Sequence, residues 1–176
     1  MRGFEQPNKG RREGLKMARI TKKTIYANYD INYRSSDGKI ESPIGWIKPL
    51  LKKGNEKVGE NTWTFSIHHG NETLSLEQVS AIVRKILEDM GKTCITGSCA
   101  CHCNGCYCDA GFYNMPDVRD GAIIRLILCR FFLDFVRRAI LAQLQADKIL
   151  LVRIHAQGDF FSADYVAMWR SVCLAY

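Results

Sequence analysis

The sequence predicts a mixed α/β (α+β) fold, in which a small antiparallel β layer precedes an incomplete βα-barrel-like unit around a cysteine metal loop. Apolar and polar residues roughly alternate over residues 20–32, and apolar side chains share one face of residues 61–67, as in half-buried strands. In the last third of the chain, a long helical segment, an apolar β segment and a second helical segment follow one another, which is half of an α/β repeat. Six of the eight cysteines lie between these two regions.

Turn and capping residues mark the predicted elements before the cysteines. An Asp-Gly pair within residues 35–38 favours a hairpin turn. Ser75 begins a predicted helix, with Gln78 three residues later as its capping-box partner. Apolar residues then follow the helical period until Gly91 ends the helix.

The elements after the cysteines are predicted from their apolar pattern. Pro116 stands at the head of a long helix over residues 117–146 that is apolar on most of its surface. Residues 148–154 are apolar without alternation, which is typical of a strand buried on both faces of a parallel sheet. Ser162 caps a last helix that runs to Tyr176. The chain ends within this apolar helix, as a truncated gene would.

Composition and charge predict two regions. At 47% apolar residues the chain can bury a core, so we expect residues 20–176 to form a single metal-stabilised α/β domain. The net charge of +7 is concentrated in residues 1–23, which hold eight Lys and Arg residues and two Glu. Residues 1–19 are therefore predicted to be a basic flexible arm. Such an arm is either a solubilising terminus or an electrostatic contact with nucleic acid or an acidic protein face.

No membrane association is predicted. The first residues carry charge, but no apolar run follows them, so there is no secretory signal. The longest apolar stretch, residues 122–136, contains three charged residues and is shorter than the roughly 20 residues that a bilayer requires. We expect a cytoplasmic protein.

The cysteines predict a metal site. In a reducing compartment, clustered cysteines are typical of metal ligands, whereas Cys129 and Cys173, on predicted helices, are expected to be buried thiols. A structural zinc ion takes four ligands in a closed tetrahedron, and an iron–sulfur cluster takes three or four cysteines. Both remain open from the residues alone. The clustered cysteines are Cys94, Cys99, Cys101, Cys103, Cys106 and Cys108.

The spacing Cys99-x3-Cys103-x2-Cys106, followed by Tyr107, resembles the radical S-adenosylmethionine motif. More narrowly, this motif and the segments 61–66 and 153–162 resemble the phage-associated gene product 88 family, a relative of that superfamily. The resemblance covers about residues 58–170. It implies that the three cysteines hold a [4Fe–4S] cluster and that Gly158 and Asp159 lie near the amino group of the cofactor.

Two departures from that pattern favour a shortened relative without catalysis. Only 70 residues follow Cys106, whereas barrels of this general kind take roughly 200 residues or more. The additional cysteines make a closed thiolate site possible, which favours structural Zn²⁺ over a [4Fe–4S] cluster. The predicted metal ligands are Cys99, Cys101, Cys103, Cys106 and Cys108, whereas Cys94 lies farthest from the Cys103–Cys106 pair.

The histidines are given lesser roles. His102 is expected to face solvent, and His68 and His69, at the end of a strand, are expected to be surface residues. His155 and Asp159 follow the predicted buried strand, where α/β proteins place ligand groups. Hydrogen bonds that stabilise a turn are an equally good explanation for this pair.

The predicted function is that of a zinc-stabilised, phage-derived binding protein that inhibits a host defence complex. The most concrete version is an anti-CRISPR protein that blocks a Cas effector nuclease by protein–protein contact in the cytoplasm of the host bacterium. Its partner would be a host protein or ribonucleoprotein, and the basic arm leaves direct contact with nucleic acid open. The alternatives are a radical S-adenosylmethionine enzyme with a [4Fe–4S] cluster and a nucleic-acid-binding zinc protein.

Overall fold

The computed structural model describes residues 50–176 apart from 55–58, 60, 100–105 and 110. The predicted basic arm, the predicted strand over residues 20–32 and the turn at 35–38 lie outside the described residues. Cys101, His102 and Cys103 also lie outside them.

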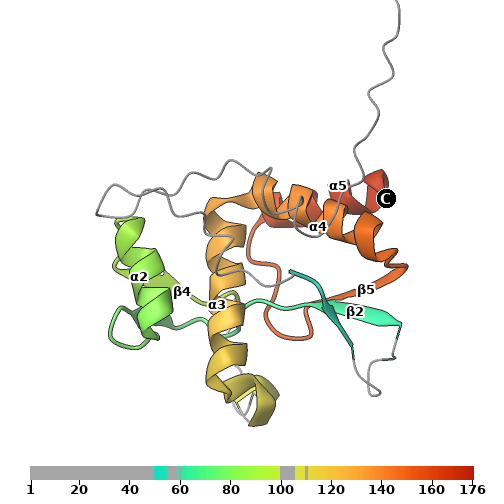
Figure 1. Ribbon diagram of the computed structural model, residues 1–176. Helices are drawn as coiled ribbons and strands as arrows, with labels where there is room; N and C mark the ends of the chain where they lie inside the picture. The colour runs from blue at the N-terminus through green and yellow to red at the C-terminus, as the bar shows by residue number, and fades with distance from the viewer. Residues whose placement is uncertain (1–49, 55–58, 60, 100–105, 110) are drawn as a thin grey trace, which may run out of the picture.

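The larger sheet has the strand order β1-β2-β5. β1 (Lys52–Lys53) pairs antiparallel with β2 (Thr62–Phe65), which confirms the predicted strand over residues 61–67. β2 also pairs in parallel with β5 (Leu151–Ile154), in a register that places Phe65 opposite Ile154. Figure 1 shows β2 and β5 side by side, although some 90 residues of chain separate them in sequence.

The burial predicted for the 148–154 strand is wrong. β5 is an edge strand of the described sheet, and its Leu151 side chain is 57% exposed. Val152 and Ile154 face the other side and pack against the core. The parallel pairing is as predicted, but a strand at an edge with one open face does not need to be apolar on both sides.

The second sheet was not predicted. Because Ser75 belongs to it, the prediction that the first helix begins at Ser75 is wrong. β3 (Thr73–Ser75) pairs antiparallel with β4 (Cys94–Thr96), so Ser75 lies opposite Cys94. The Ser75 N–H still donates to Oε1 of Gln78 at 2.8 Å, but this bond closes a turn. Helix α2 (Ala81–Asp89) begins later, where the Ser80 side chain accepts from the Val83 N–H.

The predicted long helix is two helices. α3 (Pro116–Phe131) and α4 (Leu133–Asp147) are separated by Phe132, whose φ of −138° and ψ of 47° are not helical. No proline or glycine marks the break. It turns the chain so that α4 packs beside α5 (Ala163–Ala175) over the larger sheet (Figure 1). Ser162 caps α5 as predicted, by accepting from the Tyr165 N–H.

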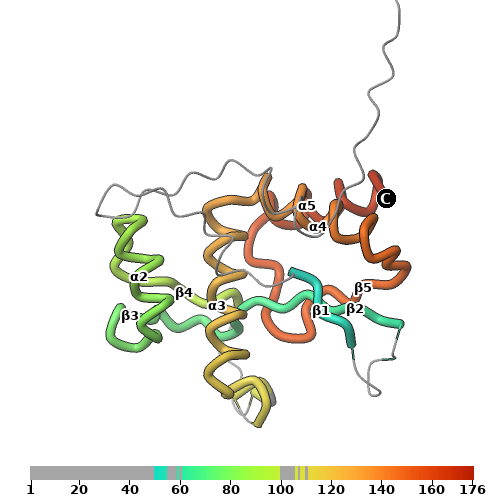
Figure 2. Tube along the Cα trace, in the orientation of Figure 1, coloured from blue at the N-terminus to red at the C-terminus, as the bar shows by residue number. Residues whose placement is uncertain are grey.

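The core lies between the helices and the sheets. Figure 2 shows α3 between α2 with its small sheet and the β1-β2-β5 sheet. Phe65 of β2 meets Trp169 of α5 edge to face, with ring centroids 5.2 Å apart. Cys129 is buried in this core as expected, whereas the prediction for Cys173 is wrong, because that thiol is exposed on α5.

The architecture confirms the predicted fold class. The described residues form a mixed α/β structure with four α-helices and two small sheets, and their strands do not close into a barrel. No described helix is both long and apolar enough to cross a membrane.

Candidate metal centre

Parallel pairing brings the segments that follow β2 and β5 to the same edge of the sheet. The pairing continues past both strands, since the His155 N–H donates to the Phe65 carbonyl at 2.8 Å and the Ile67 N–H to the Gln157 carbonyl at 3.2 Å. His68 and His69 therefore lie beside residues 157–159. In open α/β sheets, this carboxyl edge is where ligands bind.

The segment before the cysteine motif crosses this edge at very close range. A Cβ atom on Gly97 would lie 2.2 Å from the Gly70 carbonyl oxygen and 2.6 Å from that of His69, so only glycine fits there. Next to it, the buried Ser98 hydroxyl donates to the His68 carbonyl at 2.6 Å and accepts from the Asp159 N–H at 3.0 Å. Three segments far apart in sequence are thus held together by their backbones.

The described cysteines of the clustered segment lie in three different surroundings. Cys99 and Cys106 both line one pocket, and the Cys99 sulfur accepts from the Gly70 N–H at 3.3 Å. Cys108 is buried and is not among the residues that line this pocket. Cys94 is exposed on β4. The first and last cysteines of the spaced motif therefore share a site, and its middle residue, Cys103, lies outside the described residues.

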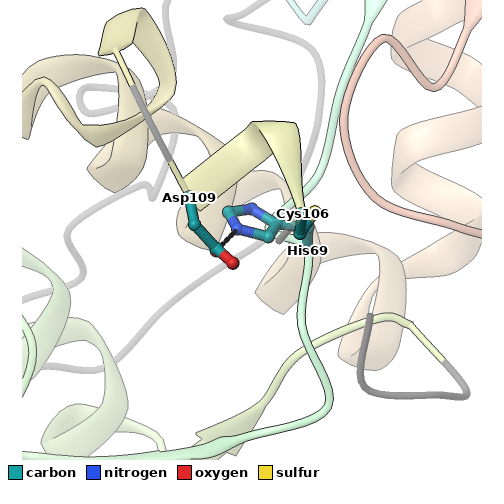
Figure 3. A group of neighbouring side chains, drawn as sticks. All are labelled: His69, Cys106 and Asp109. Atoms are coloured by element: carbon teal, nitrogen blue, oxygen red, sulfur yellow. Dashed lines mark hydrogen bonds and ion pairs between the residues drawn. The ribbon is translucent and has the colours of Figure 1, made fainter. Parts of the chain in front are cut away.

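Among the described residues, a cluster of potential ligand atoms at this edge combines three residue types. A ring nitrogen of His69, Cys106 Sγ and a carboxylate oxygen of Asp109 all lie within 4.8 Å of one another. The His69 N–H at Nε2 donates to Asp109 Oδ1 at 2.6 Å. Figure 3 shows His69 and Asp109 joined by this hydrogen bond, with Cys106 beside the imidazole ring. Cys106 directly precedes the short 3-10 helix η2 (Tyr107–Asp109), and Asp109 is its last residue.

The imidazole of His69 is held from both sides. On the side away from Asp109, the amide nitrogen of Gln157 donates to His69 Nδ1 at 2.6 Å. Gln157 and His69 are 3% and 8% exposed, whereas the Asp109 side chain is 63% exposed. The cluster therefore has a rigid buried side and an open side.

The open side is a pocket of about 420 Å³. Besides the cluster it is lined by His68, Cys99, Asn114 and Arg119. Asn114 belongs to a second 3-10 helix, η3 (Gly111–Asn114), and its side-chain amide donates to the Asp109 carbonyl. This bond holds η2 against the turn that leads into α3.

His68 is neutral in this setting. Its pKa is lowered to about 4, first by burial and then by electrostatic interaction with the neighbouring His69 and Arg119 side chains. Within the described residues, its buried Nδ1 atom has no hydrogen-bond partner. Buried polar atoms of this kind are commonly satisfied by ordered water or by a ligand.

The donor chemistry fits a borderline divalent cation. Imidazole nitrogen, thiolate sulfur and carboxylate oxygen are the three ligand types that Zn²⁺ takes in proteins. Cys99 and Cys106 in one pocket also fit two corners of a thiolate-bound cluster.

The surface assignment of His69 is wrong, and Asp109 was missed altogether. His69 is 8% exposed because Gln157 and Asp109 cover it on both sides. The sequence did contain one signal for His69, since polar residues directly after a strand are candidate ligands in parallel sheets.

His155 and Asp159, the other candidate pair, both contribute to local structure. Asp159 Oδ1 accepts from the Phe160 N–H, and His155 shares a hydrogen bond with the Tyr165 hydroxyl.

Comparison with known proteins gives one match. The sequence model of the family described as Gene product 88 matches residues 49–176, which is well over half of the chain. The chain belongs to the gene product 88 family. This family is phage-associated. No curated protein and no solved structure matches the chain.

The gene product 88 region contains the whole of the cluster. His69, Cys106, Asp109 and Gln157 all lie within the matched residues, as do β2, β5 and the cysteine motif. The resemblance seen in the sequence is thus confirmed for the family.

Proposed function

We propose that this gene product 88 protein is a zinc-binding phage protein that inhibits a host defence complex by direct contact. One observation carries the metal part of the proposal. Cys99 and Cys106 line the same pocket as the buried His69, at the carboxyl edge of two parallel strands. Thiols and imidazole are ligand types that Zn²⁺ takes, and His69 and Cys106 bring their ligand atoms within 4.8 Å of each other.

The role in host defence rests on the phage-associated family and on the charge of the chain. A protein of a phage family that holds a metal-stabilised surface is suited to bind a host macromolecule. The concrete target that we propose is a Cas effector nuclease with its guide RNA. The net charge of this chain, +7, suits binding to a ribonucleoprotein or to an acidic protein face. It does not suit mimicry of DNA, which requires an acidic surface.

The metal part is tested by the content and colour of the purified chain. We expect a colourless protein with one Zn²⁺ per chain by plasma mass spectrometry. Cys106→Ser should lower the metal content and the melting temperature, because metal binding is coupled to folding. Cys94→Ser is the matched control, since this exposed thiol lies outside the pocket and its loss should change neither quantity.

The inhibitor part is tested with a panel of purified Cas effector–guide complexes. We expect co-elution with one complex and loss of its DNA cleavage, both weakened by added salt because charge contributes to the contact. A chain that carries zinc but leaves every complex fully active would refute the role in defence and leave the metal site intact.

A second candidate function is a radical S-adenosylmethionine enzyme. It is favoured by the positions of Cys99 and Cys106, the first and last residues of the spaced motif, beside an open pocket. When bound, a [4Fe–4S] cluster would supply one-electron chemistry. A brown protein that contains iron and sulfide and that cleaves S-adenosylmethionine under reduction would establish this function in place of the zinc protein.

A further inference from the structure

We infer that the zinc ion of the proposed function is held by a mixed donor set, His69 Nε2, Cys106 Sγ and an oxygen of Asp109, with a fourth coordination position that faces the pocket and that no described residue fills. This inference rests on the proposed function, whose metal it assigns to ligands. It differs from an all-cysteine site, because two of the three ligands come from outside the cysteine motif.

The distances allow this set with little movement. The three ligand atoms lie within 4.8 Å of one another. Bonds of about 2.0–2.3 Å in a tetrahedron separate ligand atoms by roughly 3.3–3.8 Å. The 2.6 Å contact between His69 and Asp109 therefore has to open by about 1 Å when the ion takes the place of the shared proton. Asp109 is the exposed member and lies on a three-residue helix, so it is the side chain best able to move.

The charges of the set balance the ion. A neutral imidazole, one thiolate and one carboxylate carry a total charge of −2, which a divalent cation neutralises. Neutrality favours the site because His69 is buried and a net charge there would be poorly solvated. Cys106 has to lose its thiol proton on binding, as metal-ligating cysteines do.

Gln157 occupies the position of an orienting partner. Histidines that bind metals through one ring nitrogen almost always hydrogen-bond through the other, which fixes the ring and its tautomer. The side-chain amide of Gln157 lies 2.6 Å from His69 Nδ1 and is 3% exposed. With the metal on Nε2, the ring proton moves to Nδ1, and the amide of Gln157 turns its oxygen toward it.

The fourth position faces the pocket. All three ligands line this cavity of about 420 Å³. His68 lines it too, and its buried Nδ1 has no partner among the described residues, so a water on the ion could donate a hydrogen bond to it. In zinc proteins, three protein ligands with water in the fourth position leave a place on the ion where a further ligand can bind.

Asp109→Asn in the full chain is the main test, because this side chain is exposed and its replacement should leave the fold intact. Zinc affinity is measured by competition with a chromogenic chelator, and the ligand field by the visible spectrum after Co²⁺ substitution. We expect Asp109→Asn to weaken zinc binding by at least about tenfold. Glu72→Gln is the matched control, since it removes the same charge from the same pocket without removing a ligand. It should change the affinity by less than about twofold.

Gln157 provides a second, independent measurement. Gln157→Leu should weaken binding by about 10–100-fold, as other losses of an orienting partner do. Gln157→Glu should weaken binding less than Gln157→Leu, because its carboxylate accepts the Nδ1–H hydrogen bond although it adds a charge at a buried position.

The outcomes separate this inference from the proposed function. If the parent binds zinc and Asp109→Asn and Gln157→Leu retain its full affinity and its Co²⁺ spectrum, the mixed donor set is refuted and the zinc protein stands. Equal losses in Asp109→Asn and Glu72→Gln would also refute it, since general electrostatics would then explain the effect. If the parent binds neither Zn²⁺ nor Co²⁺, the proposed function itself fails.

Discussion

Replacing Gly97 by alanine tests whether the close crossing of segments organises the site. The backbone of Gly97 does not adopt a positive φ, so alanine meets no conformational barrier of its own. Its Cβ would instead lie 2.2 Å and 2.6 Å from the carbonyl oxygens of Gly70 and His69. Both obstacles are backbone atoms, which cannot rotate away, so the His69–Gly70 segment has to shift.

The expected loss of stability is about 2 kcal/mol. Overpacking of a well-packed site costs typically about 1–3 kcal/mol, and two backbone contacts belong at the upper end of that range. Alanine also has less conformational freedom than glycine in the unfolded chain, which offsets about 0.4–1 kcal/mol of this destabilisation. Gly121→Ala is the matched control, because its Cβ would meet only side-chain atoms of Arg125, the nearest being Nη1 at the ordinary contact distance of 3.4 Å within helix α3. There we expect a gain of about 0.5–1 kcal/mol.

Urea unfolding followed by circular dichroism measures both variants. With an m-value of about 2 kcal/mol/M, the Gly97→Ala midpoint should fall by about 1 M and the Gly121→Ala midpoint should rise by less than 0.5 M, as estimates from typical m-values. The curves are recorded with zinc and with a chelator, so that metal binding is separated from packing. A Gly97→Ala protein that unfolds at the parent midpoint in chelator would show that the three segments do not cross as closely as described.

Three further predictions concern the core and the pH dependence. Gln143→Leu should lower the free energy of unfolding by about 3 kcal/mol in urea titrations, because it leaves the buried N–H and carbonyl of Leu51 without the bonds of 2.9 and 2.8 Å that they make to this side chain. Burial raises the pKa of the Cys129 thiol to about 12, so iodoacetamide at pH 8 should label the exposed Cys173 and leave Cys129 unmodified in peptide mass spectra; equal labelling of the two would contradict the buried position. Burial lowers the pKa of His155, so the unfolded chain takes up this proton first and stability should fall as the pH drops below about 6.5. His155→Asn, which tolerates the left-handed φ of 61°, should make this fall between pH 7 and 5 shallower, and an unchanged slope would show that His155 does not contribute to it.

Element types could be predicted from the sequence where a local signal decides them. The Ser162 cap, the 61–67 strand and the parallel pairing of β5 were predicted correctly, since caps and apolar patterns act within a few residues. The break at Phe132 could not be predicted in this way. Neither glycine nor proline marks it, and it allows α4 to pack beside α5, which is a tertiary requirement.

The start of α2 shows how a correct local interaction can lead to the wrong element. Ser75 and Gln78 make the predicted hydrogen bond, but pairing with Cys94 keeps Ser75 in a strand. A strand partner nearly 20 residues away therefore overrides a capping pattern. The small β3–β4 sheet has the further effect of positioning Gly97 and Ser98 directly before the cysteine motif.

By itself, the sequence determined that this chain has a mixed α/β fold and a cysteine-rich segment with metal-ligand spacing, because both depend on residue types at short separations. Only the tertiary structure decided which side chains meet. His69 lies 40 residues from Asp109 and 88 from Gln157, and they come together because β2 and β5 run parallel and end at one edge. That proximity depends on strand register and on the absence of a side chain at Gly97. Neither can be inferred from the pattern of residues around His69.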